Sequence, residues 1–426
     1  MEERNEKIMA DERQTPVINK GNPQKDSVVS KYAELLDKFE NGKEDNMKVV
    51  DVVDNLSPDK KRPVLIIGMG QCGANVAHVA QKENFQTCAV NTSEEDIKNC
   101  IVDEKFIYNN AKGSGKERSR SKNIFAENVE EFTDFISERF GDVPTYIVVC
   151  SAGGGTGGGS GPMCANFLKN NFPNKNVFLI VVQGSIAEDI KSQENMAEVF
   201  EELMKADVNY LVFDNDRAGD YENIDDMYDK INKDIVESCK FISRDYFVEN
   251  TRSNIDEMDM QKLYLENKRM FIVAGNFDRK IASKESYSEQ IIRAINNSTQ
   301  ISPTGNPMAY AFFMSVEDRI YDSIDTNFRD IIDTYGESYE TYKHLQDKYP
   351  NTPDFVVCMT GLSDCVERYE LINRRIADFK ARVEYGRTMD DVEKVKINAR
   401  KDTKVQLPSE NKKSDGLDKS MLSKFM

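Results

Sequence analysis

The feature that most constrains the fold is the glycine-rich run SAGGGTGGGSGP at residues 151–162, in which seven of twelve residues are glycine. It follows the apolar residues 146–150, which predict a buried strand, and the small and apolar residues after Pro162 favour a helix start. Glycine has no Cβ, so this backbone can adopt positive φ and approach a ligand closely. A strand, a glycine loop and a helix N-terminus present free N–H groups to an anion. The run therefore predicts a phosphate cradle for a nucleotide; the alternative, a flexible linker, is seldom framed by a strand and a helix.

A second glycine loop lies upstream, where the predicted strand at 63–67 leads into GMGQCG at residues 68–73. This fits G-x-G-x-x-G, the pattern of a dinucleotide-binding fold, which places an acidic residue about 20 residues further on. Here the next strand, at 87–90, ends in Asn91-Thr92, and the nearest acids, Glu94 and Glu95, lie beyond it. We therefore keep a dehydrogenase-like fold only as an alternative.

The usual nucleotide-triphosphatase signatures are absent from the sequence. The GSGK of residues 113–116 is followed by Glu117 rather than Ser or Thr, and Asn232-Lys233 is followed by Asp234-Ile235 rather than by x-Asp. The chain is therefore expected to hold phosphates with glycine backbone rather than with a lysine loop.

The sequence GGGTG at 153–157, preceded by GQCG at 70–73, resembles the tubulin/FtsZ superfamily, and further motifs extend the resemblance over residues 63–385. The resemblance implies an α/β fold with a Rossmann-like parallel-sheet GTPase domain, a long central helix and a second, smaller α+β domain. It also implies a GTPase that binds GTP or GDP with Mg²⁺ and polymerises head to tail into filaments.

The resemblance assigns the nucleotide contacts residue by residue. Asn91 matches the second loop, residues 113–115 match the loop that faces the γ-phosphate, and Glu188 matches the ribose-binding acid, although Asp189 could take that place. Asn215 and Asn232 would read guanine, and the Tyr228 ring would stack near it, since positions i and i+4 share a helix face. The full predicted set is Gly70, Gln71, Cys72, Asn75, Asn91, Gly113, Ser114, Gly115, Ala152, Gly153, Gly154, Gly155, Thr156, Gly157, Gly158, Glu188, Asn215, Tyr228 and Asn232.

The segment NIDEMD at 254–259 is similar to the family's N-x-D-x-x-D loop, which lies past the central helix and enters the nucleotide pocket of the next subunit. The resemblance implies that Asp256 and Asp259, with Asn254 beside them, position and polarise the attacking water. Phosphoryl transfer needs in-line water and charge neutralisation, mostly by Mg²⁺ and backbone N–H groups. The alternative is a solvated acidic loop in a chain of net charge −17.

The chain departs from the family pattern near these loops. Lys116, Arg118, Arg120 and Lys122 follow the third loop; they could contact the triphosphate, but we interpret them as a solvated helix face. The ribose loop lacks an Arg a few residues past the acid, and Lys191 is the nearest substitute. The phosphate loop continues Gly-Gly-Ser after Gly-Thr-Gly, where relatives usually have Ser, Thr or Ala sooner.

Composition indicates a cytoplasmic protein, and the resemblance to the phage and plasmid tubulins implies a bacterial or phage-infected host cell. The chain has 426 residues, 39% of them hydrophobic, no apolar run of membrane-spanning length and an acidic, polar N-terminus unlike a secretion signal. A pI of about 4.9 argues against general nucleic-acid binding. Eight cysteines without a C-x-x-C pattern and only two histidines do not favour a zinc site, so we expect packing roles for Cys72 and His78.

The predicted organisation is a mostly disordered extension at 1–60, a nucleotide-binding domain at 61–219, a central helix and catalytic loop at 220–267, a C-terminal domain at 268–385 and a tail at 386–426. The C-terminal domain is expected to contain strands near 270–274, 309–314 and 354–359, a helix at 286–295 and a closing helix from Asp364 to about Glu384. The tail is expected to meet an adaptor protein or a cargo and is unlike the terminal peptide of division FtsZ proteins. These features favour the phage and plasmid tubulins (TubZ and PhuZ groups), whose filaments position or segregate DNA or virions. An FtsZ-type division-ring protein and a non-polymerising nucleotide-binding protein are the alternatives.

Overall fold

The computed structural model describes residues 61–401 apart from 110–111, 220, 222 and 249–251, and describes residues 386–401 as backbone only. The features predicted for residues 1–60 and for the tail beyond 401 lie outside the described residues. The chain divides into two compact units, Met1–Arg374 and Arg375–Met426, and the sheet lies in the first. In the described part, no helix is both long enough and apolar enough to cross a bilayer.

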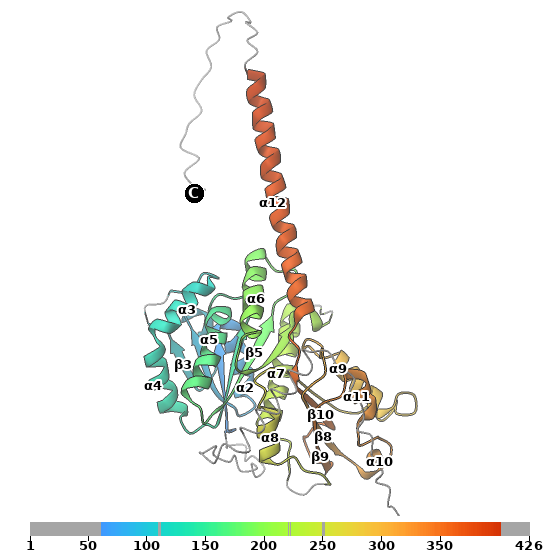
Figure 1. The fold of residues 1–426 in the computed structure, drawn as a ribbon. Coiled ribbons are helices and arrows are strands. Elements are labelled where there is room, and N and C mark those ends of the chain that lie inside the picture. The colour runs from blue at the N-terminus through green and yellow to red at the C-terminus, as the bar shows by residue number, and fades with distance from the viewer. Residues whose placement is uncertain (1–60, 110–111, 220, 222, 249–251, 402–426) are drawn as a thin grey trace, which may run out of the picture. The chain divides into compact units, whose positions relative to one another are not determined.

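One ten-stranded sheet runs through the first unit, in the order β3-β2-β1-β4-β5-β6-β7-β10-β8-β9 (Figure 1). Its strands are β1 (Val64–Met69), β2 (Gln86–Asn91), β3 (Glu104–Ile107), β4 (Thr145–Ser151), β5 (Asn176–Gln183), β6 (Asn209–Asp214), β7 (Arg269–Gly275), β8 (Ala309–Val316), β9 (Glu340–Asp347) and β10 (Phe355–Leu362). The helices are α2 (Gly70–Gln81), α3 (Arg118–Glu127), α4 (Val129–Phe140), α5 (Thr156–Asn171), α6 (Ile190–Leu203), α7 (Ile224–Ile242), α8 (Glu257–Leu263), α9 (Tyr287–Asn296), α10 (Asp318–Tyr321), α11 (Arg329–Tyr335) and α12 (Val366–Lys401). Short 3₁₀ turns, η1 and η2, span Glu95–Ile97 and Asn215–Arg217.

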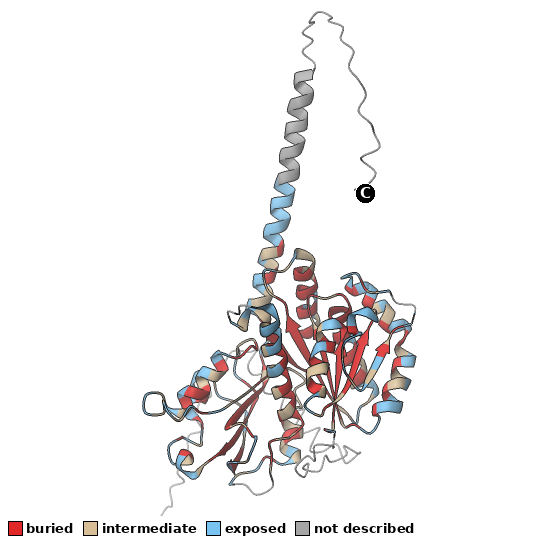
Figure 2. Cartoon of the chain, turned by 180° about the vertical axis from the view of Figure 1, so that it is seen from behind, coloured by how far each residue is buried: buried red, intermediate tan, exposed pale blue. Residues whose placement is uncertain are grey.

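The first six strands pair in parallel, which confirms the predicted α/β fold. Every residue of β1 is buried, as expected for a strand covered by helices on both faces (Figure 2). The strand order reverses between β1 and β4, and ligands of open α/β sheets bind outside the carboxyl ends of strands at such a reversal. Both glycine loops follow these two strands.

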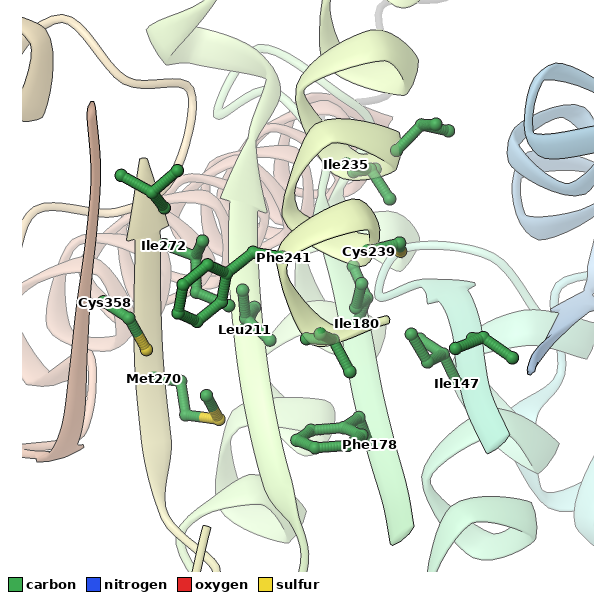
Figure 3. Close-up of a cluster of buried hydrophobic side chains, with 14 of the residues drawn as sticks. Ile147, Phe178, Ile180, Leu211, Ile235, Cys239, Phe241, Met270, Ile272 and Cys358 are labelled. Carbon is green, nitrogen blue, oxygen red and sulfur yellow. The ribbon is translucent and has the colours of Figure 1, made fainter. Parts of the chain in front are cut away.

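The long central helix α7 is confirmed, and its apolar side packs on one face of the sheet (Figure 3). Ile235, Cys239 and Phe241 of this helix belong to one buried cluster with residues of β4 and β5 and also of β7 and β10. The helix therefore joins the parallel half of the sheet to the C-terminal half. Its contacts include η2, which follows the carboxyl end of β6.

The C-terminal half is a mixed β region with its own core. Strand β7 continues the sheet through a parallel pairing of Arg269 with Tyr210, β10 pairs antiparallel with β7 and β8, and β8 pairs in parallel with β9. A second cluster, which includes Ile291 and Ile295 of α9, covers the opposite face. The predicted strands near 270–274, 309–314 and 354–359 and the helix at 286–295 are confirmed, whereas β9, α10 and α11 were not predicted. The division into two domains stays a prediction, since one sheet runs through both.

Helix α12 does not end near Glu384 as the sequence predicts but continues to Lys401. The tail predicted from Gly386 therefore begins as a continuation of this helix. One glycine inside a helix costs only about 1 kcal/mol relative to alanine, which is too little to end a helix of this length.

Candidate functional site

Two helix N-termini meet at the point where the strand order reverses. Helix α2 begins at Gly70 directly after β1, and α5 begins at Thr156 after β4, and no side chain caps the first turn of either helix. The two turns touch, because a Cβ added to Gly70 would lie 2.9 Å from the backbone N of Gly157. The first-turn N–H groups of both helices are thus gathered at one place, where they suit an anion.

The start of α5 corrects the sequence prediction. The helix begins at Thr156 rather than after Pro162, so Gly157, Gly158, Gly159 and Gly161 lie inside its first turns and none has positive φ. The run is glycine-rich because its backbone is closely packed. A Cβ added to Gly158 would lie 2.5 Å from the carbonyl oxygen of Ala152, and one added to Gly161 would lie 2.6 Å from the Cys150 Sγ.

Arg118 explains why a proline is tolerated inside this helix. Pro162 has no N–H to donate to the carbonyl of Gly158, four residues earlier. The Nε of Arg118 donates to that carbonyl instead, at 2.9 Å, and the guanidinium pairs with Glu198 at 2.5 Å and Glu202 at 2.6 Å. Arg118 is 3% exposed, so its assignment to a solvated helix face is wrong.

The first turns of α2 and α5 form the phosphate cradle. The second loop, at residues 91–92, and the third loop, at 113–115, close it from the other side. The Thr156 hydroxyl lies 2.8 Å from the Thr92 hydroxyl and 3.1 Å from the Ser114 hydroxyl, and the N–H of Gly113 donates to the Thr92 carbonyl. Asn91 turns inward, since its Oδ1 accepts from the N–H of Thr92 at 2.7 Å. Thr92 was not among the predicted site residues, although its hydroxyl joins the loops.

The open side of the cradle is marked by three glycines. Gly113 and Gly115 have φ of 79° and 60°, and a Cβ added to either would meet nothing within 4 Å. A Cβ added to Gly154 would meet only the Ser151 hydroxyl, at 2.9 Å. A ligand with the bulk of a phosphate can therefore approach the backbone here.

Of the two candidate ribose acids, Glu188 faces the cradle. A Cβ added to Gly153 would lie 3.2 Å from its Oε2, and burial raises the pKa of the Glu188 carboxyl. Asp189 instead caps α6 by accepting from the N–H of Ser192 and pairs with Lys116. The structure thus separates the roles of the adjacent acids.

The predicted base-reading residues lie at the end of the cradle beyond β5 and β6. Asn215 follows β6, and its Oδ1 is shielded from solvent without a hydrogen-bond partner among the described residues. Tyr228 is 43% exposed and Asn232 is buried, on the same face of α7. Burial, followed by the charge of Glu188, raises the pKa of the Tyr228 hydroxyl.

Helix α2 contributes the remaining predicted residues. Gln71 and Asn75, four residues apart, are exposed on one face of the helix. Burial raises the pKa of the Cys72 thiol to about 12, so it stays protonated at neutral pH and is a poor nucleophile. His78 accepts from the N–H of Ile101 at 2.9 Å, which is a structural contact.

The acidic loop forms the start of α8. Asp256 is the N-cap and accepts from the N–H of Asp259 at 2.8 Å, while the Asp259 carboxylate accepts from the N–H of Asp256 at 3.1 Å, a complete capping box. Asn254 and Asp256 are exposed and Asp259 is half-buried. Burial, together with the neighbouring Asp256 charge, raises the pKa of the Asp259 carboxyl.

This loop lies at the amino ends of the parallel strands, opposite the carboxyl ends that carry the glycine loops (Figure 1). Glu257 and Met260 of α8 line a cleft with Pro63 and Pro144, which precede β1 and β4. The glycine loops follow the carboxyl ends of the same strands, and a six-residue strand is about 20 Å long. The acidic pair therefore cannot reach the cradle of its own chain.

The backbone of the acidic loop is held from both sides at Ile255. Its N–H donates to Nδ1 of the buried His344 on β9, at 3.4 Å, and its carbonyl accepts from Arg244 at 3.1 Å. The loop also pairs with β9 through Ser253 and Leu345. Neither His344 nor Arg244 could be found from sequence, because their partners come from distant segments.

We expect His344 to make stability acid-sensitive. Burial lowers its pKa to about 4, so the unfolded chain binds more protons between that value and the ordinary histidine pKa, and stability falls as pH falls through this window. The expected loss between pH 7 and pH 5 is about 2 kcal/mol of unfolding free energy. His344→Asn, which keeps an acceptor for Ile255, should remove that part of the slope in urea unfolding. An unchanged slope in the variant would contradict the assignment.

These features describe an α/β fold with an uncapped, glycine-lined cradle at one end of the strands and an acidic loop at the other. Residues 63–223 match the model of the Tubulin/FtsZ family, GTPase domain, so this segment is similar to that domain.

Curated relatives are archaeal. The Tubulin-like protein CetZ of Pyrococcus abyssi is 26% identical over 243 residues, which cover 55% of this chain and 66% of the relative. CetZ1 of Haloferax volcanii is 28% identical over 190 residues, covering 40% of this chain and 47% of the relative. The chain thus spans less than two thirds of the length of these relatives.

Solved structures share the fold. TubZ of Clostridium botulinum phage c-st superposes with a TM-score of 0.61 at 20% identity, covering 76% of this chain and 99% of that one. CetZ2 of Haloferax volcanii gives 0.60 at 19% identity, covering 74% and 99%. The TubZ and CetZ folds fit equally well, so the likeness does not favour the phage and plasmid group predicted from the sequence.

Proposed function

We propose that this chain is a GTPase that polymerises head to tail into protofilaments. One observation carries the proposal. The uncapped, glycine-lined phosphate cradle lies at the carboxyl ends of the parallel strands, and the acidic pair lies at their amino ends. A stacked neighbour would bring its acidic pair to the cradle and complete the site. The family of the matched segment is that of a GTPase domain, and a protofilament of CetZ2 with GTPγS is among the similar structures.

The cradle binds the phosphates in this proposal. The first turns of α2 and α5 supply N–H donors around Gly70 and the segment Ala152 to Gly158, and the third loop at 113–115 closes on the far side. Glu188 accepts from the ribose, while Asn215 and Asn232 read guanine beside Tyr228. The unpartnered Oδ1 of Asn215 fits a donor on a bound base.

Asp256 and Asp259 of the neighbouring subunit act on the attacking water, with Asn254 beside them. Their capping box fixes both carboxylates on a helix start. A water held between the subunits gives its proton to one of these carboxylates as its oxygen bonds to the γ-phosphorus, while the bond from that phosphorus to the bridging oxygen breaks and GDP leaves. Cradle N–H groups stabilise the charge on the transferred phosphoryl group.

Mg²⁺ fits this site as an ion that arrives with the nucleotide. The hydroxyls of Thr92, Ser114 and Thr156 are oxygen donors at the cradle, and Mg²⁺ usually adds phosphate oxygens and water to few protein ligands. When bound, it would neutralise negative charge on the phosphates.

The cellular role has two candidates. The curated CetZ relatives favour an archaeal cytoskeletal filament. The equally good fit to TubZ of a Clostridium botulinum phage supports the second candidate, a filament that positions or segregates DNA or virions. Whether the tail meets an adaptor or cargo belongs to the same question.

We expect the purified chain to sediment and to form filaments in electron micrographs with GTP or GTPγS, but not with GDP or ATP. Phosphate release should rise more steeply than in proportion to protein concentration, because each active site needs two molecules. A sample that stays monomeric and cleaves GTP at a constant rate per molecule would overturn the proposal.

A further inference from the structure

Lys116 lies against the phosphate cradle although it belongs to no phosphate-binding lysine motif. It directly follows the third loop and has a φ of 63°. A Cβ added to Gly155 would lie 2.7 Å from its Cα, and the Asn195 side-chain amide donates at 3.0 Å to the carbonyls of both Lys116 and Gly153. The backbone of Lys116 is therefore fixed on top of the loop between β4 and α5.

The Lys116 side chain crosses from the third loop to the start of α6. Its Nζ lies 2.6 Å from the Asp189 carboxylate and 3.3 Å from the Ser192 hydroxyl. Its charge also counteracts the effect of burial on the Glu188 pKa. The ammonium group thus lies at the rim of the cradle, near the carboxylate that faces Gly153.

Three other cations of this region already have partners. Arg118 is buried and occupied by Gly158 and two glutamates, Lys122 pairs with Glu202, and Lys191 pairs with Glu117. The Lys116–Asp189 pair is open to solvent on both sides, with each side chain 55% exposed, whereas Lys122 and Glu202 are 35% and 29% exposed. Such an exposed pair contributes about 0–1 kcal/mol, so its lysine can exchange partners at little cost.

The order of the sheet indicates which phosphate would attract this lysine. The base-reading residues follow β6 and lie on α7, the glycine loops follow β4 and β1, and the third loop follows β3 at the far edge. A nucleotide laid across these strand ends has its terminal phosphate nearest the third loop. That phosphate carries more negative charge than one carboxylate and accepts strong charge-assisted hydrogen bonds.

We infer that Lys116 is a nucleotide-binding residue that exchanges Asp189 for the terminal phosphate of a bound triphosphate and so favours GTP over GDP. This inference rests on the proposed function, since it deepens the same site. It supplies a cation from the third loop, near the ribose loop that lacks an Arg a few residues past its acid.

The test is fluorescence titration of the full chain with mant-GTP and mant-GDP, at protein concentrations too low for assembly. Lys116→Met is expected to weaken GTP binding by about tenfold or more and GDP binding much less, since a charge-assisted hydrogen bond is lost. Lys116→Arg should restore most of the preference. Lys122→Met, which removes a cation of helix α3 that pairs with Glu202 away from the cradle, should leave both affinities unchanged.

Asp189→Asn gives an independent test with the opposite sign. Asparagine keeps the N-cap of α6 but no longer competes as an anion, so GTP binding should stay equal or tighten. In the double variant with Lys116→Met, the Asp189→Asn change should have no further effect.

The results separate the inference from the proposed function. Wild-type chain that binds neither nucleotide would overturn the proposed function. Wild-type chain that prefers GTP, with a Lys116→Met variant that keeps that preference or loses both affinities equally, would overturn the inference alone.

Discussion

A mixture of the Asp256→Asn and Gly154→Val variants is expected to hydrolyse GTP, although each variant alone is nearly inactive. The first keeps its cradle and lacks the Asp256 carboxylate of the acidic loop. The second keeps the acidic loop and has its cradle blocked. The cradle and the acidic loop lie at opposite ends of the parallel strands, so they can meet only between two molecules.

Asp256→Asn isolates the charge of this residue from its structural role. Asparagine is as good an N-cap as aspartate, so the start of α8 and its capping box are kept. Loss of a positioned base typically lowers turnover by about 10²- to 10⁴-fold. Binding of mant-GTP should be unchanged, because the cradle lies at the other end of the strands.

The mixing experiment measures phosphate release at equal total protein. With random head-to-tail stacking, about one quarter of the interfaces would pair an intact cradle with an intact acidic loop. Release approaching that fraction of the wild-type rate is the expected result. A mixture no more active than its components, or an Asp256→Asn variant with wild-type turnover, would refute catalysis between subunits.

The sequence was most informative where signals are local. The strand at 64–69 and the glycine turn into α2 follow each other directly, and the amphipathic pattern of α7 identifies it from one segment. The edge strand β9 was missed because its sequence, ETYKHLQD, is mostly polar and its partner β8 begins more than thirty positions upstream, as the bounds Glu340 and Ala309 indicate.

The start of α5 shows what local reasoning misses. Glycine and proline disfavour a helix interior on average, so the sequence placed the helix start after Pro162. A side chain 40 residues upstream, Arg118, supplies the missing donor to Gly158, and tight packing favours glycine at each first-turn position. Propensity was overridden by tertiary contacts that no short segment contains.

The position of the acidic loop was expected from the resemblance, but its support was not. Asp256 and Asp259 stand out as a motif, whereas the contacts that hold them come from Arg244 and from His344 on β9. Those partners are set by topology, so only the folded chain identifies them.

Gly154→Val is expected to abolish GTP binding while leaving the fold nearly as stable as wild type. Gly154 is the half-exposed member of a loop whose neighbours are buried, its φ is not positive, and the one nearby atom, the Ser151 hydroxyl, can rotate away. The added side chain would therefore fill the open side of the cradle. Because phosphate must approach that backbone closely, mant-GTP affinity should fall by at least about 100-fold, as expected when several hydrogen bonds to a charged group are lost.

Gly158→Ala is the matched control for this prediction. Its Cβ would lie 2.5 Å from the Ala152 carbonyl, so the backbone itself must move, and such overpacking costs about 1–3 kcal/mol of unfolding free energy. Urea unfolding should therefore distinguish the two variants, with Gly158→Ala unfolding at lower urea and Gly154→Val close to wild type. If Gly154→Val binds GTP normally, the phosphates do not lie on this face of the loop, and the cradle, the order of the nucleotide along the strands and the place of Lys116 all fail together.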